Sequence, residues 1–333
     1  MSQVVLLGID VGAKEVVCAL QRGQRDALLA TFSNDHEGHA KLLRWALKHG
    51  QTVRACLEAT GVYGLDLALA MHATKGVSVM VVNPRAIKDF SRASMIRAKT
   101  DKVDAQIILA YLERMPFQIW QPPRASILEL RAVARRIVQL KFELSRERNR
   151  LHSVTYSAKT ARCITNDIQV NIRHLERRIK ALEAMGFELI QLDPSLATQY
   201  AHLVSVRGIA TASAIRLLGE LLVLPDGLKA PQWVAHAGLD PRPYDSGTST
   251  HKPRRISKTG NTHLRAVLYM PALVAIQREP QVRAFYNKLL SAGKKPMQAV
   301  VAVMRKLLLA IWGMLKNNQD FDGSRFYSLP SGT

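Results

Sequence analysis

The sequence predicts a mixed α/β domain at the N-terminus, a long helical middle and a mainly α-helical C-terminal domain. Two observations lead to this assignment. Strand-like and helix-like runs alternate through about the first 115 residues, whereas from about residue 124 the apolar residues recur every three or four positions, as in helices that bury one face. We therefore divide the chain into residues 1–120, 121–192 and 193–333, because 333 residues are enough for two or three domains.

The first part contains five predicted strands. Short β-prone runs lie over residues 4–9, 15–20 and 27–32. After them come a helix over 35–49, a strand over 52–57, a helix over 63–74, a strand over 77–82 and a further helical region after Asn83-Pro84. Three strands in a meander, followed by alternating strand and helix, are the order of a ribonuclease-H-like domain; a doubly wound sheet normally lacks the opening meander.

The middle part predicts two heptad-patterned helices. Their apolar seam positions, interrupted by Glu147, are Leu130, Val133, Ile137, Leu140, Leu144, Leu151 and Val154, then Ile168, Ile172, Leu175, Ile179 and Leu182. Such a pair predicts an antiparallel or dimerising coiled coil. Between residues 124 and 180 there are 14 Lys or Arg against 5 Asp or Glu. Arg135, Arg136, Arg177 and Arg178 are therefore candidates for nucleic-acid contact, and the alternative is a solvated helix face.

The last part combines helical segments with a long polar segment. LVSVRGIATASAIRLLGEL has the form helix, tight turn, helix with Gly208 at the turn. Helix-hairpin-helix elements of this form offer backbone N–H groups to a phosphate, but Ala210 stands where a second glycine is usual. Residues 239–261 have no apolar period and are dense in Pro, Gly, Ser and Thr, which predicts a long loop that is functional or disordered. Helices resume at THLRAVLYMPALVAI and KPMQAVVAVMRKLLLAIWGML.

The charge of the chain points to a polyanionic partner. Lys and Arg outnumber Asp and Glu by 47 to 26, a net charge of +21, which favours nucleic acid first and an anionic membrane second. The best apolar run is interrupted by Arg305 and Lys306, and no basic signal-peptide region opens the chain. Cys18, Cys56 and Cys163 show no CxxC pairing and are expected to be buried thiols. We expect a cytoplasmic protein without membrane contact.

Four acidic residues stand where an apolar element begins or ends. Asp10 closes the first strand and Glu58 the fourth, and in a ribonuclease-H-like sheet those strands lie side by side. Asp101 and Asp104 are three apart, so on a helix they share a face that can reach the same edge. Carboxylates suit Mg²⁺, and two such ions roughly 4 Å apart can drive phosphoryl transfer. The alternative is that Asp101 N-caps a helix and Asp104 complements its dipole.

The polar segment places a serine near a basic cluster. Ser246 is followed by Gly247 and then by His251, Lys252, Arg254, Arg255 and Lys258. A serine hydroxyl becomes a nucleophile when a base takes its proton and cations stabilise the developing phosphorane. An isolated Ser-Gly pair is ordinarily a turn, and Ser249 and Ser257 are equally near the cluster. The residues alone therefore do not choose among the three serines.

Five segments together resemble one known family. They are GIDVGAK, LEATGVYG, NPRAIKDF…AKTDKVDA, AGLDPRPYDSGT…ISKTGNTHLRAVLY and FYNKLLSAGKKPMQAVVAVMRKLL. In this order, over almost the whole chain, they resemble the IS110 family of transposases, also called bridge-RNA-guided recombinases. The resemblance implies a RuvC-like domain with a DEDD carboxylate set, a coiled-coil linker and a C-terminal transposase domain with a catalytic serine. Carried over to this chain, the set falls on Asp10, Glu58, Asp101 and Asp104, and the serine on Ser246.

The resemblance also implies a reaction and its partners. Serine attack would keep the free energy of the phosphodiester in a phosphoserine bond, assisted by carboxylate-bound Mg²⁺ or Mn²⁺. The implied partners are donor and target double-stranded DNA, a structured bridge RNA that selects them, and further copies of the chain as a dimer, or a tetramer in the synaptic complex. The implied location is the bacterial cytoplasm, at the nucleoid when active. Lys252, Arg254, Arg255 and Lys258 are our candidates for phosphate contact near the serine. The sequence itself shows no RRM, KH or other RNA-reading motif.

Three other function classes fit parts of the sequence. The main alternative is a RuvC-like junction endonuclease, which would use the same four carboxylates to hydrolyse DNA without a covalent intermediate. LLGIDVGAKEVVCAL also resembles the first phosphate motif of actin-like ATPases and sugar kinases, but their second phosphate loop and adenosine site are missing from the sequence. In an architectural nucleic-acid binder, four clustered acids would oppose binding to phosphates.

Overall fold

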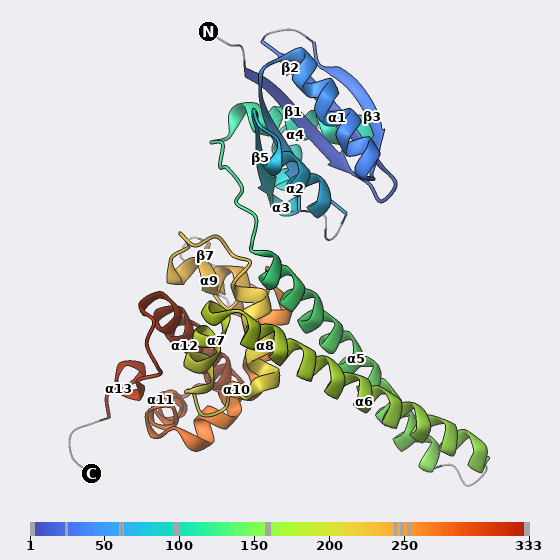
Figure 1. The fold of residues 1–333 in the computed structure, drawn as a ribbon. Helices are drawn as coiled ribbons and strands as arrows, with labels where there is room; N and C mark the ends of the chain where they lie inside the picture. Colours follow the sequence, from blue (N-terminus) through green and yellow to red (C-terminus); the bar gives the residue numbers. More distant parts are fainter. Residues whose placement is uncertain are drawn as a thin grey trace. The chain divides into compact units, whose positions relative to one another are not determined.

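The computed structural model describes residues 4–23, 26–59, 61, 63–95, 100–156, 161–242, 245–246, 250–251 and 255–329. The chain forms two compact units, Met1–Pro122 and Pro123–Thr333, whose elements are shown in Figure 1. Each unit has its own hydrophobic core. Each is therefore a compact domain in its own right.

A five-stranded mixed sheet forms the centre of the first unit. Its strands are β1 (Val4–Val11), β2 (Glu15–Arg22), β3 (Leu28–Ser33), β4 (Thr52–Glu58) and β5 (Val77–Val82). They lie in the order β3-β2-β1-β4-β5. The first three strands are antiparallel neighbours, β4 runs parallel to β1, and β5 runs parallel to β4. The predicted mixed α/β arrangement, an opening meander followed by parallel strands, is confirmed, and this strand order is consistent with a ribonuclease-H-like domain.

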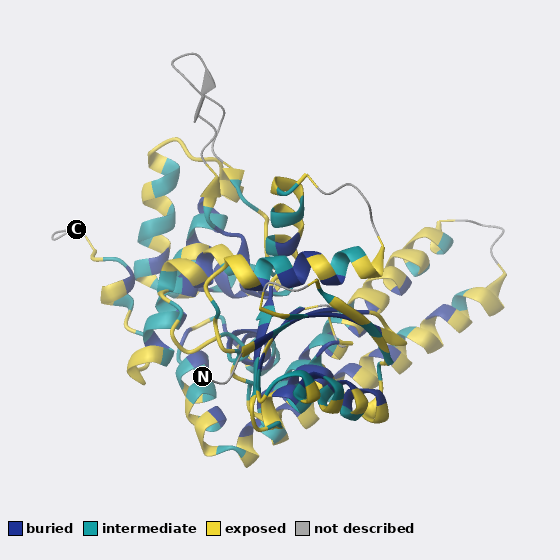
Figure 2. Ribbon diagram, turned by 90° about the horizontal axis from the view of Figure 1, so that it is seen from above, coloured by how far each residue is buried: buried dark blue, intermediate teal, exposed yellow. Residues whose placement is uncertain are grey.

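Helices cover both faces of this sheet. They are α1 (His36–His49), α2 (Leu65–Ala73), α3 (Pro84–Ala93) and α4 (Asp101–Arg114). Side chains alternate between the two faces along a strand. Leu7 and Ile9 therefore pack into one buried cluster with α1 and α2, whereas Cys56 packs on the other face with Ile108 of α4. The central strands are largely buried, as the dark blue in Figure 2 shows, whereas the edge strand β3 is not.

Polar caps start the helices close to the predicted positions. Asp35 N-caps α1, its carboxylate accepting from the backbone N–H of Gly38 at 2.7 Å. Asn83 N-caps α3, accepting from the backbone N–H of Arg85 at 2.9 Å, and Pro84 occupies the first helical position. An N-cap oxygen satisfies a backbone donor that has no partner inside the helix.

The second unit begins with a hairpin of two long helices. They are α5 (Ala125–Thr155) and α6 (Arg162–Leu192). The two helices lie side by side and antiparallel, as Figure 1 shows. Leu140, Leu144, Leu175 and Ile179 form a buried cluster between them, at predicted seam positions. We call this pair the α5–α6 hairpin.

Glu147, the acid in the predicted seam, is buried beside a basic partner on its own helix. Its side chain forms an ion pair with Arg150, three residues later. A buried carboxylate is tolerated when it is paired. The ion pair with Arg150 therefore explains how a glutamate occupies a position that is otherwise apolar.

The base of the α5–α6 hairpin is joined by polar contacts. Arg124 Nη1 and Ser126 Oγ each donate to the carboxylate of Asp193 at 2.9 Å. The same carboxylate accepts from the backbone N–H groups of Ser195 and Leu196 and N-caps the next helix. Asp193 thus joins the start of α5 to the end of α6.

Seven further helices complete the described part of the second unit. They are α7 (Pro194–Val204), α8 (Thr211–Leu221), α9 (Ala230–Ala237), α10 (Thr262–Arg278), α11 (Pro280–Ser291), α12 (Pro296–Asn317) and α13 (Gly323–Phe326). Leu130 and Ile137 of α5 are buried in the same cluster as Leu218, Leu268 and Leu307. The base of the hairpin and the C-terminal helices therefore share one core.

Helix α12 is the one helix among the described residues that is long and apolar enough to cross a membrane. Its Val303, Leu307 and Ile311 are fully buried in the core of the second unit. A core helix of a globular unit has the same length and composition, and the burial of these residues identifies α12 as such a helix.

Residues 239–261 contain short strands where the sequence predicts a loop without regular structure. The strands are β6 (Pro241–Arg242), β7 (Asp245–Ser246), β8 (Thr250–His251) and β9 (Arg255–Ile256). β6 pairs with β9, and β7 pairs with β8, both antiparallel. Ladders of two residues carry no detectable hydrophobic period, which is why the sequence pattern misses them. We call residues 239–261 the serine ribbon.

The cysteines differ in exposure. Cys18 and Cys56 are buried free thiols, as predicted. Cys163 is a free thiol as well, but it is exposed in the first turn of α6, so the prediction that it is buried is wrong. The solvent-facing side of a paired helix accepts a small residue of any polarity, and the sequence around Cys163 gives no apolar stripe to bury it.

Candidate active site

Asp10 and Glu58 lie next to each other at one edge of the sheet. The parallel register of β1 and β4 pairs Ile9 with Leu57, so Asp10 and Glu58 are the next residues of the two strands. Both residues are half-buried. The ends of parallel strands meet at one edge, and the structure places these two acids there as the sequence predicts.

Gly8 allows α4 to approach the same face of the sheet. Gly8 and Asp10 are two residues apart on β1, so they point to one face. A Cβ on Gly8 would lie 2.3 Å from the backbone nitrogen of Leu109 and 2.5 Å from the carbonyl oxygen of Ala105. Only a residue without a Cβ permits this contact. Helix α4 thereby packs against β1 through Ala105, the residue after Asp104.

Glu58 shares this face with α4. Cys56 lies two residues before Glu58 on β4 and packs against Ile107 and Ile108 of α4. Burial raises the pKa of Cys56 to about 12, and the charge of Glu58 adds to the effect. The carboxylate of Glu58 is therefore on the α4 side of the sheet, with the carboxylate of Asp10.

Helix α4 begins with a threonine cap rather than with Asp101. Thr100 is the N-cap, its hydroxyl accepting from the backbone N–H of Val103 at 3.3 Å. Asp101 is the first residue of the helix and is exposed, whereas Asp104 is half-buried in the same turn. The alternative is therefore wrong in making Asp101 the N-cap, whereas Asp104 does lie in the first turn, where its charge complements the helix dipole.

Three of the four acids interact through their charges. Burial raises the pKa of Glu58 above its ordinary value, and the negative charges of Asp10 and Asp104 raise it further. Asp101 is not among the charges that act on Glu58. Like charges disfavour ionisation of their neighbours. We call Asp10, Glu58 and Asp104 the acidic cluster.

The acidic cluster has the donor chemistry of a site for a hard divalent cation. Mg²⁺ is bound through one or two carboxylates together with water and phosphate oxygens. Among the residues that the structure describes, no three His, Cys, Asp or Glu side chains are arranged closely enough to hold a metal directly. The charges of Asp10 and Asp104 act on Glu58, and all three side chains are hard oxygen donors.

Asn34 and His39 join the two loops that follow the strand-end acids, and sequence reasoning missed them. Asn34 Nδ2 donates to the carbonyl oxygens of Gly12 at 2.8 Å and Tyr63 at 3.0 Å. Its Oδ1 lies 2.8 Å from Nε2 of His39, which is buried in α1. Gly12 follows Asp10 and Tyr63 follows Glu58 along the chain. No spacing in the sequence connects Asn34 to either loop, so only the structure reveals these hydrogen bonds.

Ser246 lies in β7 of the serine ribbon, where the backbone pairs it with Thr250. Of the other two serines considered, Ser249 lies outside the described residues. Ser257 Oγ donates to Asp240 Oδ1 at 2.6 Å and accepts from the backbone N–H of Thr259 at 3.3 Å. The Ser257 hydroxyl therefore serves to hold the base of the ribbon together.

The predicted nucleic-acid contacts on the α5–α6 hairpin differ in their surroundings. Arg136, Arg177 and Arg178 are exposed. Arg135, by contrast, is half-buried and its Nε donates to Oε1 of the buried Glu220 at 2.8 Å. Exposed cations on a helix are available to phosphates, whereas Arg135 already has a structural partner.

The predicted phosphate contacts on the serine ribbon are described in part. Arg255 lies in β9 and is exposed, and Lys258 is exposed in the segment that follows, with a left-handed backbone at φ 53°. Lys252 and Arg254 lie outside the described residues. The described half of the cluster thus places two cations at the C-terminal side of the ribbon.

Gly208, the turn residue of the predicted helix-hairpin-helix, packs against α10. Its φ is +124°, and a Cβ there would lie 2.7 Å from the carbonyl oxygen of Pro271 and 3.1 Å from the nitrogen of Ala275. Glycine is required by this backbone conformation and this close approach. The turn between α7 and α8 therefore has a packing explanation.

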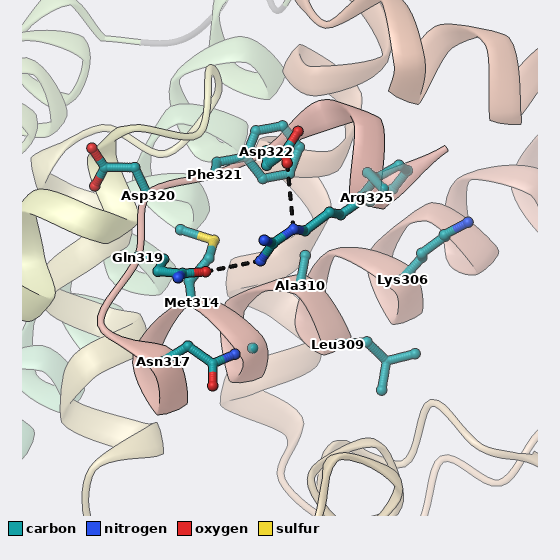
Figure 3. A pocket seen from close by; sticks show the side chains of 12 residues that line it. Lys306, Leu309, Ala310, Met314, Asn317, Gln319, Asp320, Phe321, Asp322 and Arg325 are labelled. Carbon is teal, nitrogen blue, oxygen red and sulfur yellow. Dashed lines mark hydrogen bonds and ion pairs between the residues drawn. The ribbon is translucent and has the colours of Figure 1, made fainter. Parts of the chain in front are cut away.

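A cavity of about 310 Å³ lies beside the end of α12 and the segment that leads into α13 (Figure 3). Leu309 and Phe326 are among its lining residues. Arg325 Nη1 donates to Gln319 Oε1 at 2.8 Å, and the guanidinium also pairs with Asp322. The cavity contains none of the residues predicted for catalysis.

Two family models match the chain. One, described as a transposase, matches residues 7–157 and so includes all four predicted carboxylates. The other, described as the transposase IS116/IS110/IS902 family, matches residues 200–287 and so includes the serine ribbon. The two matches cover the four predicted carboxylates and Ser246, whereas Arg177 and Arg178 lie between the matched ranges.

Similar proteins are found over nearly the full length of the chain. A pilin gene-inverting protein of Moraxella lacunata is 32% identical over 325 residues, which span 95% of this chain and 97% of that protein. The pilin gene-inverting protein of Moraxella bovis is 31% identical over the same spans. A protein of insertion element IS110 from Streptomyces coelicolor is 24% identical over 286 residues, 83% of this chain and 66% of that protein.

Proposed function

This chain belongs to the IS110 family of transposases and is a DNA transposase or recombinase, and on that basis we propose that it exchanges DNA strands through a covalent bond to Ser246. The observation that carries the proposal is the acidic cluster at the sheet edge, where Asp10 and Asp104 raise the pKa of Glu58. Acidic groups that shift one another's pKa are typical of functional sites, and a cation and a phosphate would suit this cluster.

In the proposal Asp10, Glu58 and Asp104 hold Mg²⁺, for which Mn²⁺ can substitute, and Asp101 completes the set from the same helical turn. The ion supplies electrophilic stabilisation of the charge that develops on a phosphate in transfer. Asp10 and Glu58 are held by adjacent strands, and Asp104 is held by the close packing of α4 on Gly8. Rigid secondary structure on all sides suits a site that must be preorganised.

The proposed reaction conserves the number of phosphodiester bonds. Ser246 Oγ loses its proton and bonds to the phosphorus of a DNA phosphodiester, while the bond from phosphorus to the 3′ oxygen breaks and that oxygen takes a proton. A 3′-hydroxyl of the second DNA then attacks the phosphoserine and releases Ser246 with its proton. Strand joining therefore needs no ATP. Arg255 and Lys258, with Lys252 and Arg254, would bind phosphates near the serine.

The proposed partners follow from the family and from the charge of the chain. The relatives in Moraxella are named as proteins that invert pilin genes, and we propose that this chain likewise inverts or inserts a DNA segment. Donor and target duplexes would be selected by a structured bridge RNA. A net charge of +21 supports binding of both nucleic acids. We propose that the protein acts in the cytoplasm, at the nucleoid.

The proposed assembly is a homo-oligomer, a dimer that forms a tetramer in the synaptic complex. The α5–α6 hairpin would act in it as a coiled coil, which its buried seam of Leu140, Leu144, Leu175 and Ile179 supports. In this assembly the acidic cluster of one subunit acts with Ser246 of another.

The test of this function is the trapping of a protein–DNA adduct. Purified protein is incubated with bridge RNA, labelled donor and target DNA and Mg²⁺, and the products are separated on a denaturing gel. Wild-type protein is expected to give a protein-linked strand, and Ser246→Ala none, although it still binds DNA and RNA. Ser249→Ala is the matched control and keeps the adduct. DNA cleavage by Ser246→Ala with a free 5′-phosphate would instead support the junction endonuclease.

A further inference from the structure

Glu220 is a buried carboxylate that the proposed reaction does not use. It lies near the end of α8, and the residue is only 2% exposed. Its Oε1 accepts from Nε of Arg135 at 2.8 Å, and its Oε2 accepts from Nδ2 of Asn261 at 2.7 Å. Nε of Arg131 is 3.8 Å from the same Oε2. Glu220 thus contacts α5 through two arginines and the end of the serine ribbon through an amide.

The electrostatics of Glu220 show that these contacts outweigh its burial. Burial alone would raise its pKa, but the hydrogen bonds from Arg135 and Asn261, together with the charges of Arg135 and Arg131, hold the pKa below its ordinary value. A buried carboxylate is stable only when such partners are in place. The ionised carboxylate therefore requires Asn261 and the arginines to keep their positions.

Asn261 is both the last residue of the serine ribbon and the N-cap of α10. Its Oδ1 accepts from the backbone N–H groups of His263 at 2.9 Å and Leu264 at 3.2 Å. Its own backbone N–H donates to the carbonyl oxygen of His236 in α9 at 2.7 Å. Both polar atoms of the Asn261 side chain are thus hydrogen-bonded: the oxygen caps α10, and the nitrogen donates to Glu220.

The residues before Asn261 are packed tightly against the other end of the ribbon. The backbone N–H of Lys258 donates to the carbonyl oxygen of Gly238 at 3.1 Å, and that of Ser257 donates to Asp240 at 2.9 Å. Gly260 has φ +121°, and a Cβ there would lie 2.2 Å from the carbonyl oxygen of His236. The two ends of the ribbon are therefore joined by backbone contacts, and Asn261 connects them to the buried Glu220.

We infer that Glu220 is a positioning residue for the serine ribbon: through Asn261 it sets where the ribbon leaves the helical core, and hence where Ser246 is held. This inference rests on the proposed role of Ser246. A link through one carboxylate and one amide has a defined direction and length, which apolar packing at the same place would not impose. The link also joins the ribbon to α5, since Arg135 holds the other oxygen of Glu220.

The test swaps the donor and the acceptor of the hydrogen bond between Asn261 and Glu220. Asn261→Asp keeps the oxygen that caps α10 but removes the donor to Glu220 and sets two carboxylates against each other. Combining it with Glu220→Gln keeps the net charge and lets the new amide donate to the new carboxylate in the opposite direction. The matched control is Asn287→Asp, the same chemical change at an exposed position of α11.

Four readouts distinguish positioning from general stability. They are the rate of covalent adduct formation, the Kd for DNA, the thermal midpoint, and hydrogen exchange of the backbone amides over residues 255–261. Asn261→Asp is expected to slow adduct formation about tenfold to a hundredfold, as for a buried polar group left without its partner. Its Kd is expected to stay within about twofold, and exchange to rise at the ribbon ends. The double variant is expected to return to within about fivefold of the wild-type rate.

The inference is overturned if Asn261→Asp forms the adduct at the wild-type rate, or if the double variant is no faster than the slower single variant. Parallel losses in DNA binding, thermal midpoint and adduct rate would assign Glu220 a purely structural role. Failure of the proposed function gives a different result, because wild-type protein would then form no serine adduct. Hydrogen exchange would still show whether the Glu220–Asn261 link holds the ribbon.

Discussion

Gly8 of β1 and Ala105 of α4 approach so closely that a Cβ on Gly8 would lie 2.5 Å from the carbonyl oxygen of Ala105. The contact is between backbone atoms, so no change of side-chain rotamer can relieve an added methyl group. Ala105 is the residue directly after Asp104. The distance between the sheet and the third acid of the cluster is therefore set by a glycine that carries no chemistry of its own.

Gly8→Ala is expected to abolish strand exchange and to lower the free energy of unfolding by about 1–3 kcal/mol, because the added methyl group forces α4 away from β1. Urea unfolding and a recombination assay measure the two effects. Gly227→Ala is the matched control, since a Cβ at Gly227 meets no atom within 4 Å. Wild-type recombination by a folded Gly8→Ala protein would show that the position of α4 is not critical.

Glu58→Gln is expected to raise the thermal midpoint of the metal-free protein while abolishing strand exchange. The substitution removes the repulsion that Asp10 and Asp104 exert on Glu58, and it also removes a proposed ligand for the ion. Differential scanning fluorimetry with and without Mg²⁺ measures the effect. Mg²⁺ should raise the midpoint of the wild type more than that of the variant.

Two further results would contradict the cation site that this prediction assumes. One is equal stabilisation of wild type and Glu58→Gln by Mg²⁺. The other is full strand exchange in excess EDTA.

Asp10→Ala, Asp101→Ala and Asp104→Ala should lose strand exchange while keeping nucleic-acid binding, because phosphate contacts by Lys and Arg supply most of the affinity.

Arg177→Glu combined with Arg178→Glu is expected to weaken binding of RNA or DNA and to reduce its salt dependence. Each phosphate contact that is lost should lower the slope of log K against log salt by about 0.9 for duplex DNA. Fluorescence anisotropy over a range of KCl concentrations measures this slope. Unchanged binding at moderate salt would assign both arginines to a solvated helix face.

Arg135→Glu should behave differently from the exposed pair, because Arg135 is a partner of the buried Glu220. The substitution places a second carboxylate beside a buried one and should destabilise the fold by about 3 kcal/mol or more. A protein that keeps its thermal midpoint and loses only nucleic-acid binding would instead make Arg135 a contact residue.

Glu220→Gln is expected to make the stability of the protein less dependent on acid pH. The folded pKa of Glu220 lies below its ordinary value of 4.5. The ionised carboxylate therefore adds stability above pH 4.5, and this contribution is lost as the pH falls through the folded pKa. Urea unfolding should show a large difference between wild type and variant at pH 7 that shrinks below pH 4.5. A difference that stays constant across this range would exclude ionised Glu220 as its source.

The sequence predicts the N-terminal sheet well because each of its strands is long enough to show an apolar run. Asp10 and Glu58 could be placed at one edge from the strand order alone, since neighbouring parallel strands end together. The apolar seam between α5 and α6 is also predicted from the sequence, because Leu140 and Leu175 belong to a pattern that extends over many helical turns. In each case a local pattern repeats often enough to specify the element.

The contacts that the sequence does not predict are single hydrogen bonds between distant residues. Asn34 reaches Tyr63 across 29 positions, and Asn261 reaches Glu220 across 41. No period connects such pairs, so they appear only when the chain is folded. The same limitation applies to Arg135. A count of basic residues does not distinguish an exposed cation from one that is paired inside the fold, as Arg135 is with Glu220.

The joint made by Asp193 at the base of the α5–α6 hairpin has a mechanical consequence. With 31 residues in each helix, the hairpin is about 46 Å long, and its base as far as Ile137 is buried in the core of the second unit. The remaining part of α5 is about 27 Å long, so a tilt of about 10° would carry its far end through about 5 Å, close to the rise of one helical turn. Small rearrangements in the core of the second unit are therefore amplified along the hairpin, which can act as a lever between distant parts of a larger assembly.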